Sequence, residues 1–230
     1  MNNIVLSSTT IGVVISLLAY QVGIFFKNKT KKSICNPLLI SILLVIVVLL
    51  VFDIDYDSYN QSAKYLSYLL TPATVSLAIP LYQQLELLKK NWIAVIVGIT
   101  SGVLTSLSCV LLMSMAFGLT HEEYVTLLPK SITTAIGMGI SEELGGIPTI
   151  TVAVIIVTGI LGNMIAEGFC KLFRITHPIS KGLAIGTSSH AMGTSKAIEL
   201  GQIEGAMSSL SIVVAGLMTV ILASIFAMFY

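Results

Sequence analysis

Apolar stretches of about twenty residues recur along this chain, with polar connections between them. A helix of about 20 apolar residues is long enough to cross a hydrocarbon core about 30 Å thick. Helices are expected because every backbone N–H group in such a core needs a partner other than water. The pattern predicts membrane-spanning helices at six places, near residues 4–26, 34–52, 65–82, 92–118, 148–170 and 206–229.

Two further stretches, residues 127–146 and 182–205, are rich in Gly, Ser and Thr, and each contains one lysine. They are too polar to face lipid and too apolar to be exposed loops. Irregular backbone at membrane depth is tolerated only inside protein or beside a water-filled cavity. We therefore expect both stretches to be re-entrant or broken helices within a single all-α membrane domain, residues 1–230.

The charges of the connections predict an orientation. Basic residues follow the first, third and fifth expected spans, whereas the other connections are acidic. The basic ones are Lys27, Lys29, Lys31 and Lys32, then Lys89 and Lys90, then Lys171, Arg174 and Lys181. Because basic loops stay in the cytoplasm, the N-terminus is expected outside a bacterial plasma membrane. All loops obey this rule only if residues 127–146 enter and leave on the outer side.

The chain also shows similarity to itself at a shift of 57 positions, where residues 70–79 align with 127–136 without a gap. Repeats with broken helices at matching positions are typical of secondary transporters. Chance similarity between apolar segments is the alternative. If the repeat is real and both copies share a shape, either the span at 65–82 or the re-entrant reading of 127–146 is wrong.

Composition and the absence of certain motifs exclude several classes of protein. The chain is 55% hydrophobic and only 10% charged, against about 25% charged residues in soluble domains. A net charge of +1 gives no basic patch for nucleic acid. The three cysteines form no CxxC pair, the three aspartates all lie within residues 53–57, and HExxH is absent. We expect no metal, no cofactor, no catalytic residue and no enzymatic activity.

Lys130 is the first candidate for binding a solute. It follows Pro129, which suits the first turn of a helix, and a helix N-terminus favours anions. With the hydroxyls of Ser131, Thr133 and Thr134 it would suit a carboxylate. In the alternative, Lys130 reaches toward the interface and the hydroxyls bond within their own helix.

His190 is the candidate for proton coupling, because imidazole exchanges a proton near neutral pH. A neutral packing histidine is the alternative. Glu167 is the second coupling candidate, although it could equally be interfacial. The hydroxyls of Ser189, Thr194 and Ser195 lie on the same stretch as His190. We expect this stretch to meet residues 127–136 near the bilayer centre, from the opposite side, and to complete the substrate site.

The chain resembles the LrgB/CidB family over nearly its whole length beyond about residue 10. Four stretches carry the resemblance: LLTPATVSLAIPLYQQ (69–84), LLPKSITTAIG (127–137), GGIPTITVAVIIVTGILGN (145–163) and GLAIGTSSHAMGTSKAIELG (182–201). The resemblance implies either a transporter of small monocarboxylates such as pyruvate or glycolate, or an antiholin-like regulator of murein hydrolase activity and autolysis. It also implies a separate LrgA/CidA-type membrane partner. We further expect a homo-oligomer in the lipid bilayer, and we favour transport because a lesion-forming protein needs no buried Lys, His and hydroxyl clusters.

Overall fold

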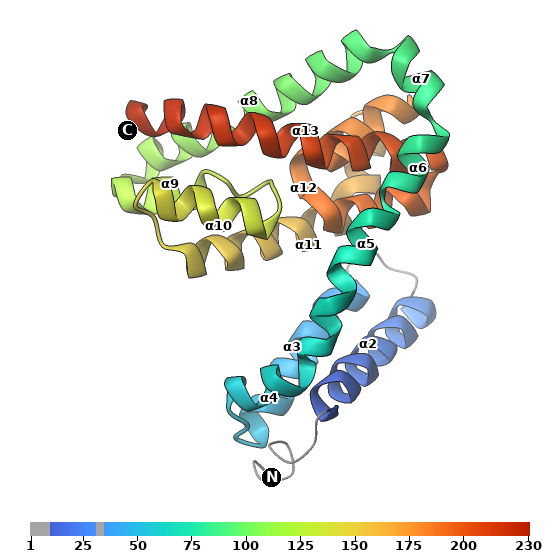
Figure 1. Ribbon diagram of the computed structural model, residues 1–230, viewed down its shortest axis with the longest axis vertical. Coiled ribbons are helices and arrows are strands. Elements are labelled where there is room, and N and C mark those ends of the chain that lie inside the picture. The colour runs from blue at the N-terminus through green and yellow to red at the C-terminus, as the bar shows by residue number, and fades with distance from the viewer. Residues whose placement is uncertain (1–9, 31–34) are drawn as a thin grey trace. The chain divides into compact units, whose positions relative to one another are not determined.

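The computed structural model describes residues 10–30 and 35–230, and all the regular structure in these ranges is helical (Figure 1). Four of the described helices are long and apolar enough to cross a membrane: Ile11–Thr30, Trp92–Phe117, Pro148–Leu172 and Gln202–Phe229. The chain is therefore an all-α integral membrane protein. The beginning of the expected first span, as well as Lys31 and Lys32, lies outside the described residues. Contacts divide the chain into two compact units, residues 1–76 and 77–230.

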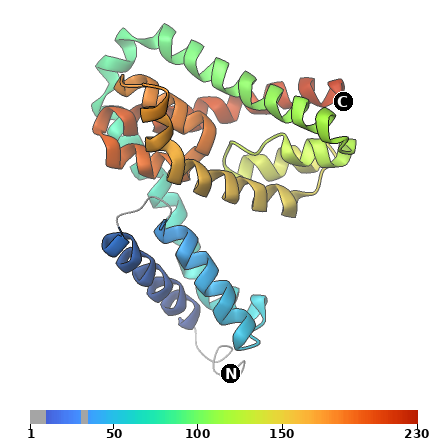
Figure 2. The ribbon, with the colours of Figure 1, turned by 180° about the vertical axis from the view of Figure 1, so that it is seen from behind.

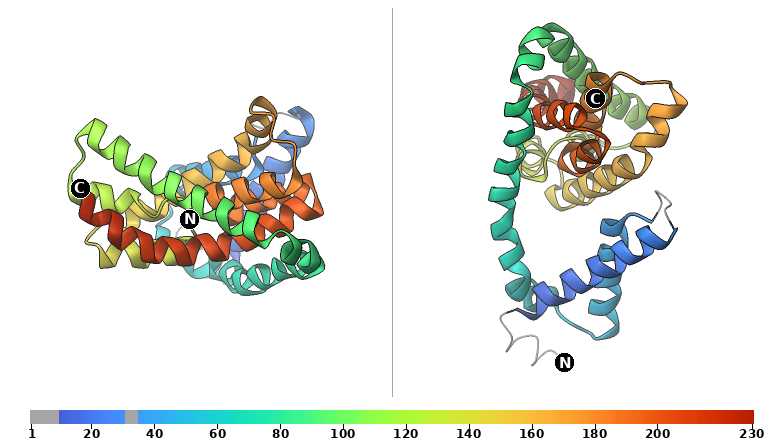
Figure 3. Two further views of the ribbon diagram at one scale, coloured as in Figure 1. Left: turned by 90° about the horizontal axis from the view of Figure 1, so that it is seen from above. Right: turned by 90° about the vertical axis from the view of Figure 1, so that its right-hand side faces the viewer.

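The N-terminal unit is built on two helices that pack against each other, α2 (Ile11–Thr30) and α3 (Pro37–Val51) (Figure 3). Asn36 caps α3 by accepting the Leu38 N–H at 2.8 Å. The Gly12 N–H of α2 donates to Ser62 Oγ of α4 (Tyr56–Ala63) at 2.9 Å. Hydrogen bonds and caps therefore fix both ends of this small bundle.

Residues 65–82, expected as one spanning helix, are instead broken into short helices. These are η1 (Lys64–Leu69), α5 (Leu70–Ser76) and α6 (Ala78–Gln83), and α7 (Leu85–Lys90) follows. Pro72 and Pro80 lie within this stretch, and a proline inside a helix removes an N–H donor and clashes with the preceding turn. The expectation of one continuous helix here was wrong, because it weighed apolar character and not these two prolines.

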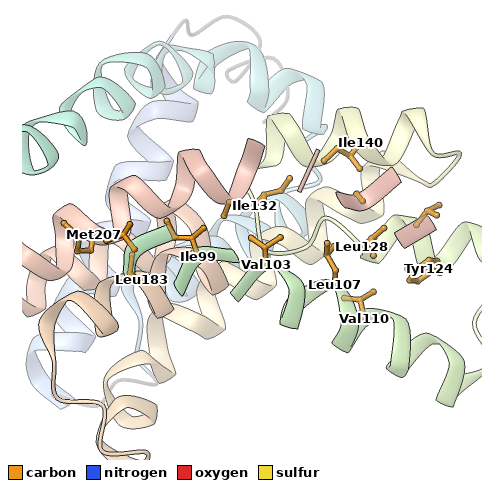
Figure 4. Close-up of a cluster of buried hydrophobic side chains, with 14 of the residues drawn as sticks. Ile99, Val103, Leu107, Val110, Tyr124, Leu128, Ile132, Ile140, Leu183 and Met207 are labelled. Carbon is orange, nitrogen blue, oxygen red and sulfur yellow. The ribbon is translucent and has the colours of Figure 1, made fainter. Parts of the chain in front are cut away.

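In the C-terminal unit, α8 (Trp92–Phe117) and α13 (Gln202–Phe226) pack together along the core (Figure 3). One face of α8 is buried at intervals of three or four residues, as the helical period requires. That face consists of Val95, Ile99, Val103, Leu107 and Val110, and Figure 4 shows most of it against Leu128, Ile132, Leu183 and Met207.

Residues 121–143 form a helix–loop–helix, here the first hairpin, from α9 (His121–Leu127) and α10 (Thr134–Glu143). A capping box starts it: Glu123 accepts the N–H and the hydroxyl of Thr120, and these hydrogen bonds lower the pKa of the Glu123 carboxyl. The hairpin leaves the end of α8 and returns to the start of α11 (Pro148–Leu172). Figures 1 and 2 both show it beside those two helix ends and the C-terminal end of α13.

Residues 178–200, α12, form the second hairpin, because the helix breaks at His190, where φ is 43° and ψ is −140°. A methyl group on Gly193 would lie only 3.0 Å from Ile185 Cγ2, eight residues earlier, so the chain folds back on itself. Thr194 of the returning arm shares a 2.7 Å hydrogen bond with Ser208 of α13. Gly186 of the entering arm also lies against the Ser208 backbone. Both arms therefore pack on α13.

The two hairpins occupy opposite halves of α11. Thr151 donates to the Thr126 carbonyl of the first hairpin at 2.9 Å. Just past the middle of the helix, Asn163 donates to the Met192 carbonyl of the second hairpin at 2.7 Å. Ile155, between them, contacts both: its side chain lies against Gly137, and its carbonyl accepts from His190. If α11 spans the bilayer, the hairpins enter from opposite sides and meet near its middle.

Candidate functional site

A cavity of about 350 Å³, here the Lys130 cleft, opens where the two hairpins meet α8. Its walls are mostly small and hydroxyl-bearing residues from three segments. They are Ser101, Gly102, Thr105, Ser106 and Cys109 of α8, Lys130 and Ser131 of the first hairpin, and Ala184, Thr187 and Ser188 of the second.

Among the described residues, Lys130 is the one charged residue that lines this cleft. Its ammonium group donates to Ser131 Oγ at 3.1 Å, and Ser131 Oγ lies 3.0 Å from Ser106 Oγ. Lysine offers only donors, whereas a hydroxyl can donate or accept. A fixed cation among hydroxyls that can turn to donate suits a small anion with several oxygens.

A second cavity of about 400 Å³, here the apolar cavity, shares Lys130, Ala184 and Ser188 with the cleft. Ser189 also lines it, but most of its surface comes from apolar side chains of α11, among them Leu161, Ile165 and Phe169. Lys130 therefore stands where a polar and an apolar hollow meet. Such a junction matches a solute with a carboxylate at one end and a small carbon skeleton at the other.

His190 lies at the turn of the second hairpin and is only 4% exposed. Its Nε2 lies 3.0 Å from the Ile155 carbonyl. A carbonyl can only accept, so Nε2 carries the hydrogen and Nδ1 is left to bind a second proton. The ring fits because residue 159 is glycine, where a methyl group would come within 2.7 Å of Nε2.

Of the predicted binding residues, the structure brings Lys130, Ser131 and Ser189 to these two cavities. The other four are not among the residues that line them. Thr133 and Thr134 lie where α10 begins. Thr194 bonds to Ser208, and Ser195 Oγ donates to the Met192 carbonyl at 2.7 Å while accepting from Asn163.

Glu167 lies near the end of α11, in ion pairs with two lysines. Lys171 Nζ is 2.8 Å from one carboxylate oxygen and Lys196 Nζ is 3.2 Å from the other. Lys196 also pairs with Glu199 at 3.3 Å. Glu167 and Lys196 thereby tie the returning arm of the second hairpin to α11.

Sequence reasoning missed the contribution of α8. Ser101, Thr105 and Ser106 lie on a mostly apolar helix, and their recurrence at helical spacing with Gly102 and Cys109 was the available signal. It also missed Glu204, a carboxylate only 8% exposed in the first turn of α13. In the described part of the chain, no three His, Cys, Asp or Glu side chains are grouped closely enough to hold a metal ion.

Comparison with known proteins gives one consistent result. The model of the LrgB-like family matches residues 16–229. The antiholin-like protein LrgB of Bacillus cereus (strain B4264) is 39% identical over 219 residues, which cover 95% of each chain. The protein of that name from Bacillus anthracis (strain CDC 684 / NRRL 3495) matches with the same identity and coverage. No solved structure matches significantly.

Proposed function

The chain belongs to the LrgB-like family, and we propose that it transports small monocarboxylates of the pyruvate and glycolate class across a bacterial plasma membrane. The observation that carries this proposal is Lys130, a cation held at the meeting point of the two hairpins and surrounded by hydroxyls. Charged groups are costly at membrane depth and typically mark substrate pathways. The size of the cleft also suits a small solute.

The hairpin arrangement supports alternating access. Secondary transporters hold their substrate near the bilayer midplane, where broken helices from opposite sides meet. Here one polar hairpin lies on each half of α11, and Ile155 contacts both. A shift of either hairpin along α11 would open Lys130 to one side at a time.

Proton coupling is assigned to His190, whose Nδ1 can bind the proton that accompanies the carboxylate. Ser188, beside the turn of the same hairpin, lines both cavities. Protonation would add a charge to this buried turn and so bias the hairpin between two positions. Glu204 and Glu167 are the carboxylates that would take this role if His190 does not.

An antiholin-like regulator is the second candidate, and the names of the Bacillus relatives favour it. An LrgA/CidA-type membrane partner and a homo-oligomer belong to both proposals. Altered autolysis could also follow indirectly from carboxylate flux.

Uptake into proteoliposomes separates the two functions. Purified protein, with and without the partner, should take up labelled pyruvate saturably when a pH gradient is imposed. A pore would instead release unrelated dyes of similar size without saturation. Dye release together with no saturable uptake would favour the antiholin-like function and refute transport.

A further inference from the structure

A third cavity, of about 320 Å³, lies where α11 ends and α12 begins. We call it the basic vestibule, because three cations and a single carboxylate line it. Its residues are Glu167, Cys170, Lys171, Arg174, Ile175, Thr176, Lys181 and Leu200. Lys171 pairs with Glu167, but Arg174 and Lys181 have no ion pair within the described residues.

Arg174 is held in a backbone conformation that does not suit it. Its φ is 55°, in the left-handed region where glycine is the usual residue after a helix. The chain turns sharply here, with the Ile175 N–H donating to the Cys170 carbonyl at 2.8 Å. An arginine at a position favourable to glycine indicates that its side chain contributes something other than the turn.

Lys181 also lies where the local electrostatic potential disfavours a cation. It lies in the first turn of α12, where the helix dipole disfavours a cation. No side chain caps this helix start and no acidic residue lies in its first turn. The amides of that turn therefore add to the positive potential from Lys181 and Arg174.

The vestibule adjoins the cavities of the proposed transport site through shared lining residues. Cys170 and Ile175 line both the vestibule and the apolar cavity. The apolar cavity in turn shares Lys130, Ala184 and Ser188 with the Lys130 cleft. A series of hollows thus runs from the end of α11 to Lys130.

We propose that the basic vestibule binds small free anions and delivers them to Lys130, which makes it the first binding site for the monocarboxylate on the side where α11 ends. This inference rests on the proposed function for the identity of the anion. Electrostatic attraction does not depend on that identity, because a basic hollow concentrates any small anion that can enter it.

Cys170 provides a native probe of the vestibule: it lines this cavity but is only 6% exposed, so a reagent must enter a cavity to reach its thiol. Changing Cys35 and Cys109 to serine leaves Cys170 as the single thiol of the chain. The protein would be placed in phosphatidylcholine nanodiscs, which expose both faces. Labelling rates would be compared for methanethiosulfonate reagents that carry a sulfonate or a trimethylammonium group. We expect the anionic reagent to react faster at Cys170.

Arg174→Gly gives the decisive variant, because it removes the charge while relieving the backbone. The anionic-to-cationic rate ratio should fall roughly fivefold, because the two reagents respond to the lost charge in opposite senses. The midpoint of thermal unfolding should stay the same or rise. Lys181→Gln should lower the ratio similarly. Asp53→Gly is the matched control, since Asp53 has a φ of 48° but lies in the N-terminal unit.

An unchanged ratio in Arg174→Gly and Lys181→Gln would overturn the proposal, as would a Cys170 that reacts with neither reagent.

Lipid headgroups are the other source of anionic groups. If adding phosphatidylglycerol to the nanodiscs abolishes the preference, headgroups and not free anions occupy the vestibule. Normal pyruvate uptake with equal rates for the two reagents at Cys170 would refute anion binding in the vestibule and leave the proposed function standing. Faster labelling by the anionic reagent without any pyruvate uptake would refute the proposed function alone.

Discussion

Lys130 is costly where it lies, and its neighbours explain how it is tolerated. A lysine near the centre of a spanning helix is disfavoured by about 2.5–3.5 kcal/mol on insertion scales. Here Ser131 accepts from the ammonium group, and Ser106 extends the hydrogen-bonded chain to α8. A bound carboxylate would supply the opposite charge that no ion pair of the described residues gives this group.

Lys130→Met should weaken binding of a monocarboxylate by about one to two orders of magnitude, because a charge-assisted hydrogen bond contributes roughly 1.5–3 kcal/mol. Isothermal titration with pyruvate would measure the change in Kd. Lys89→Met, in α7, is the control and should bind normally. Wild-type affinity in Lys130→Met would remove this residue from the site.

His190 has a backbone role and a ring role, and two substitutions separate them. Both His190→Gly and His190→Ala lose the hydrogen bond to Ile155 and should lose proton coupling. Only glycine adopts a φ of 43° readily, so the alanine variant should unfold about 1–2 kcal/mol more easily than the glycine variant.

Chemical denaturation would compare the stabilities of these two variants, and uptake with and without a pH gradient would test coupling. Equal stability would show that the left-handed turn imposes no cost. Uptake by His190→Gly that still depends on the gradient would move the proton to Glu204 or Glu167.

At the scale of elements, the second hairpin depends on close approach to α13. Gly186 faces the backbone of Ser208, and a methyl group there would lie 2.5 Å from the Ser208 carbonyl oxygen. Small residues at such contacts let membrane helices pack closely. The hairpin can pack this closely on α13 because glycine leaves this space.

Gly186→Ala should therefore destabilise the protein by about 1–3 kcal/mol through overpacking. Gly139→Ala is the matched control, since nothing lies within 4 Å of a methyl group there and the residue is in the middle of α10. That change should be neutral or stabilising by about 0.5–1 kcal/mol. Thermal unfolding of both variants in one detergent would test the contrast; a loss in Gly139→Ala as large as that in Gly186→Ala would contradict it.

Some of these elements can be predicted from the sequence, and others cannot. The polar, glycine-rich stretches could be recognised as broken because lipid excludes such backbone unless it is buried. The break at His190 could not be located, since a positive φ remains uncommon for every residue other than glycine, histidine included. The helix expected at 65–82 is interrupted, because apolar character in a window does not register Pro72 and Pro80.

The same limit applies to the site. Lys130 and Ser131 could be predicted because charge and hydroxyls stand out in an apolar chain. The recurrence of hydroxyls on α8 was visible in the sequence, but their role in the cleft was not, since serine in a membrane helix commonly bonds to its own backbone. Ser101 Oγ does so, donating to the Gly98 carbonyl at 2.8 Å, while still lining the cleft. Which helix face meets the hairpins is a tertiary property.

At the scale of the whole molecule, the membrane-spanning helices determine which loops lie on the same side of the bilayer. If α8 spans the bilayer, Lys89 and Glu122 lie on opposite sides, because one precedes and the other follows it. Arg174 lies beyond the far end of α11 from the first hairpin. The positive-inside rule then places Lys89 and Arg174 in the cytoplasm.

Single cysteines in a cysteine-free background would test this orientation in intact cells. A cysteine at Glu122 should react with an impermeant thiol reagent, whereas cysteines at Lys89 and Arg174 should be protected until the cells are opened. Labelling at Arg174 from outside would mean that the first hairpin crosses the membrane completely.

The meeting of two hairpins at the middle of α11 has an electrical consequence. Lys130 lines two cavities, so we expect the membrane voltage to fall mainly across the few residues at the hairpin tips. One elementary charge crossing 100 mV exchanges about 2.3 kcal/mol with the field. A carboxylate that crosses alone would therefore be driven by the voltage and carry a current. Transport of a carboxylate together with one proton from His190 would be electroneutral and carry no current.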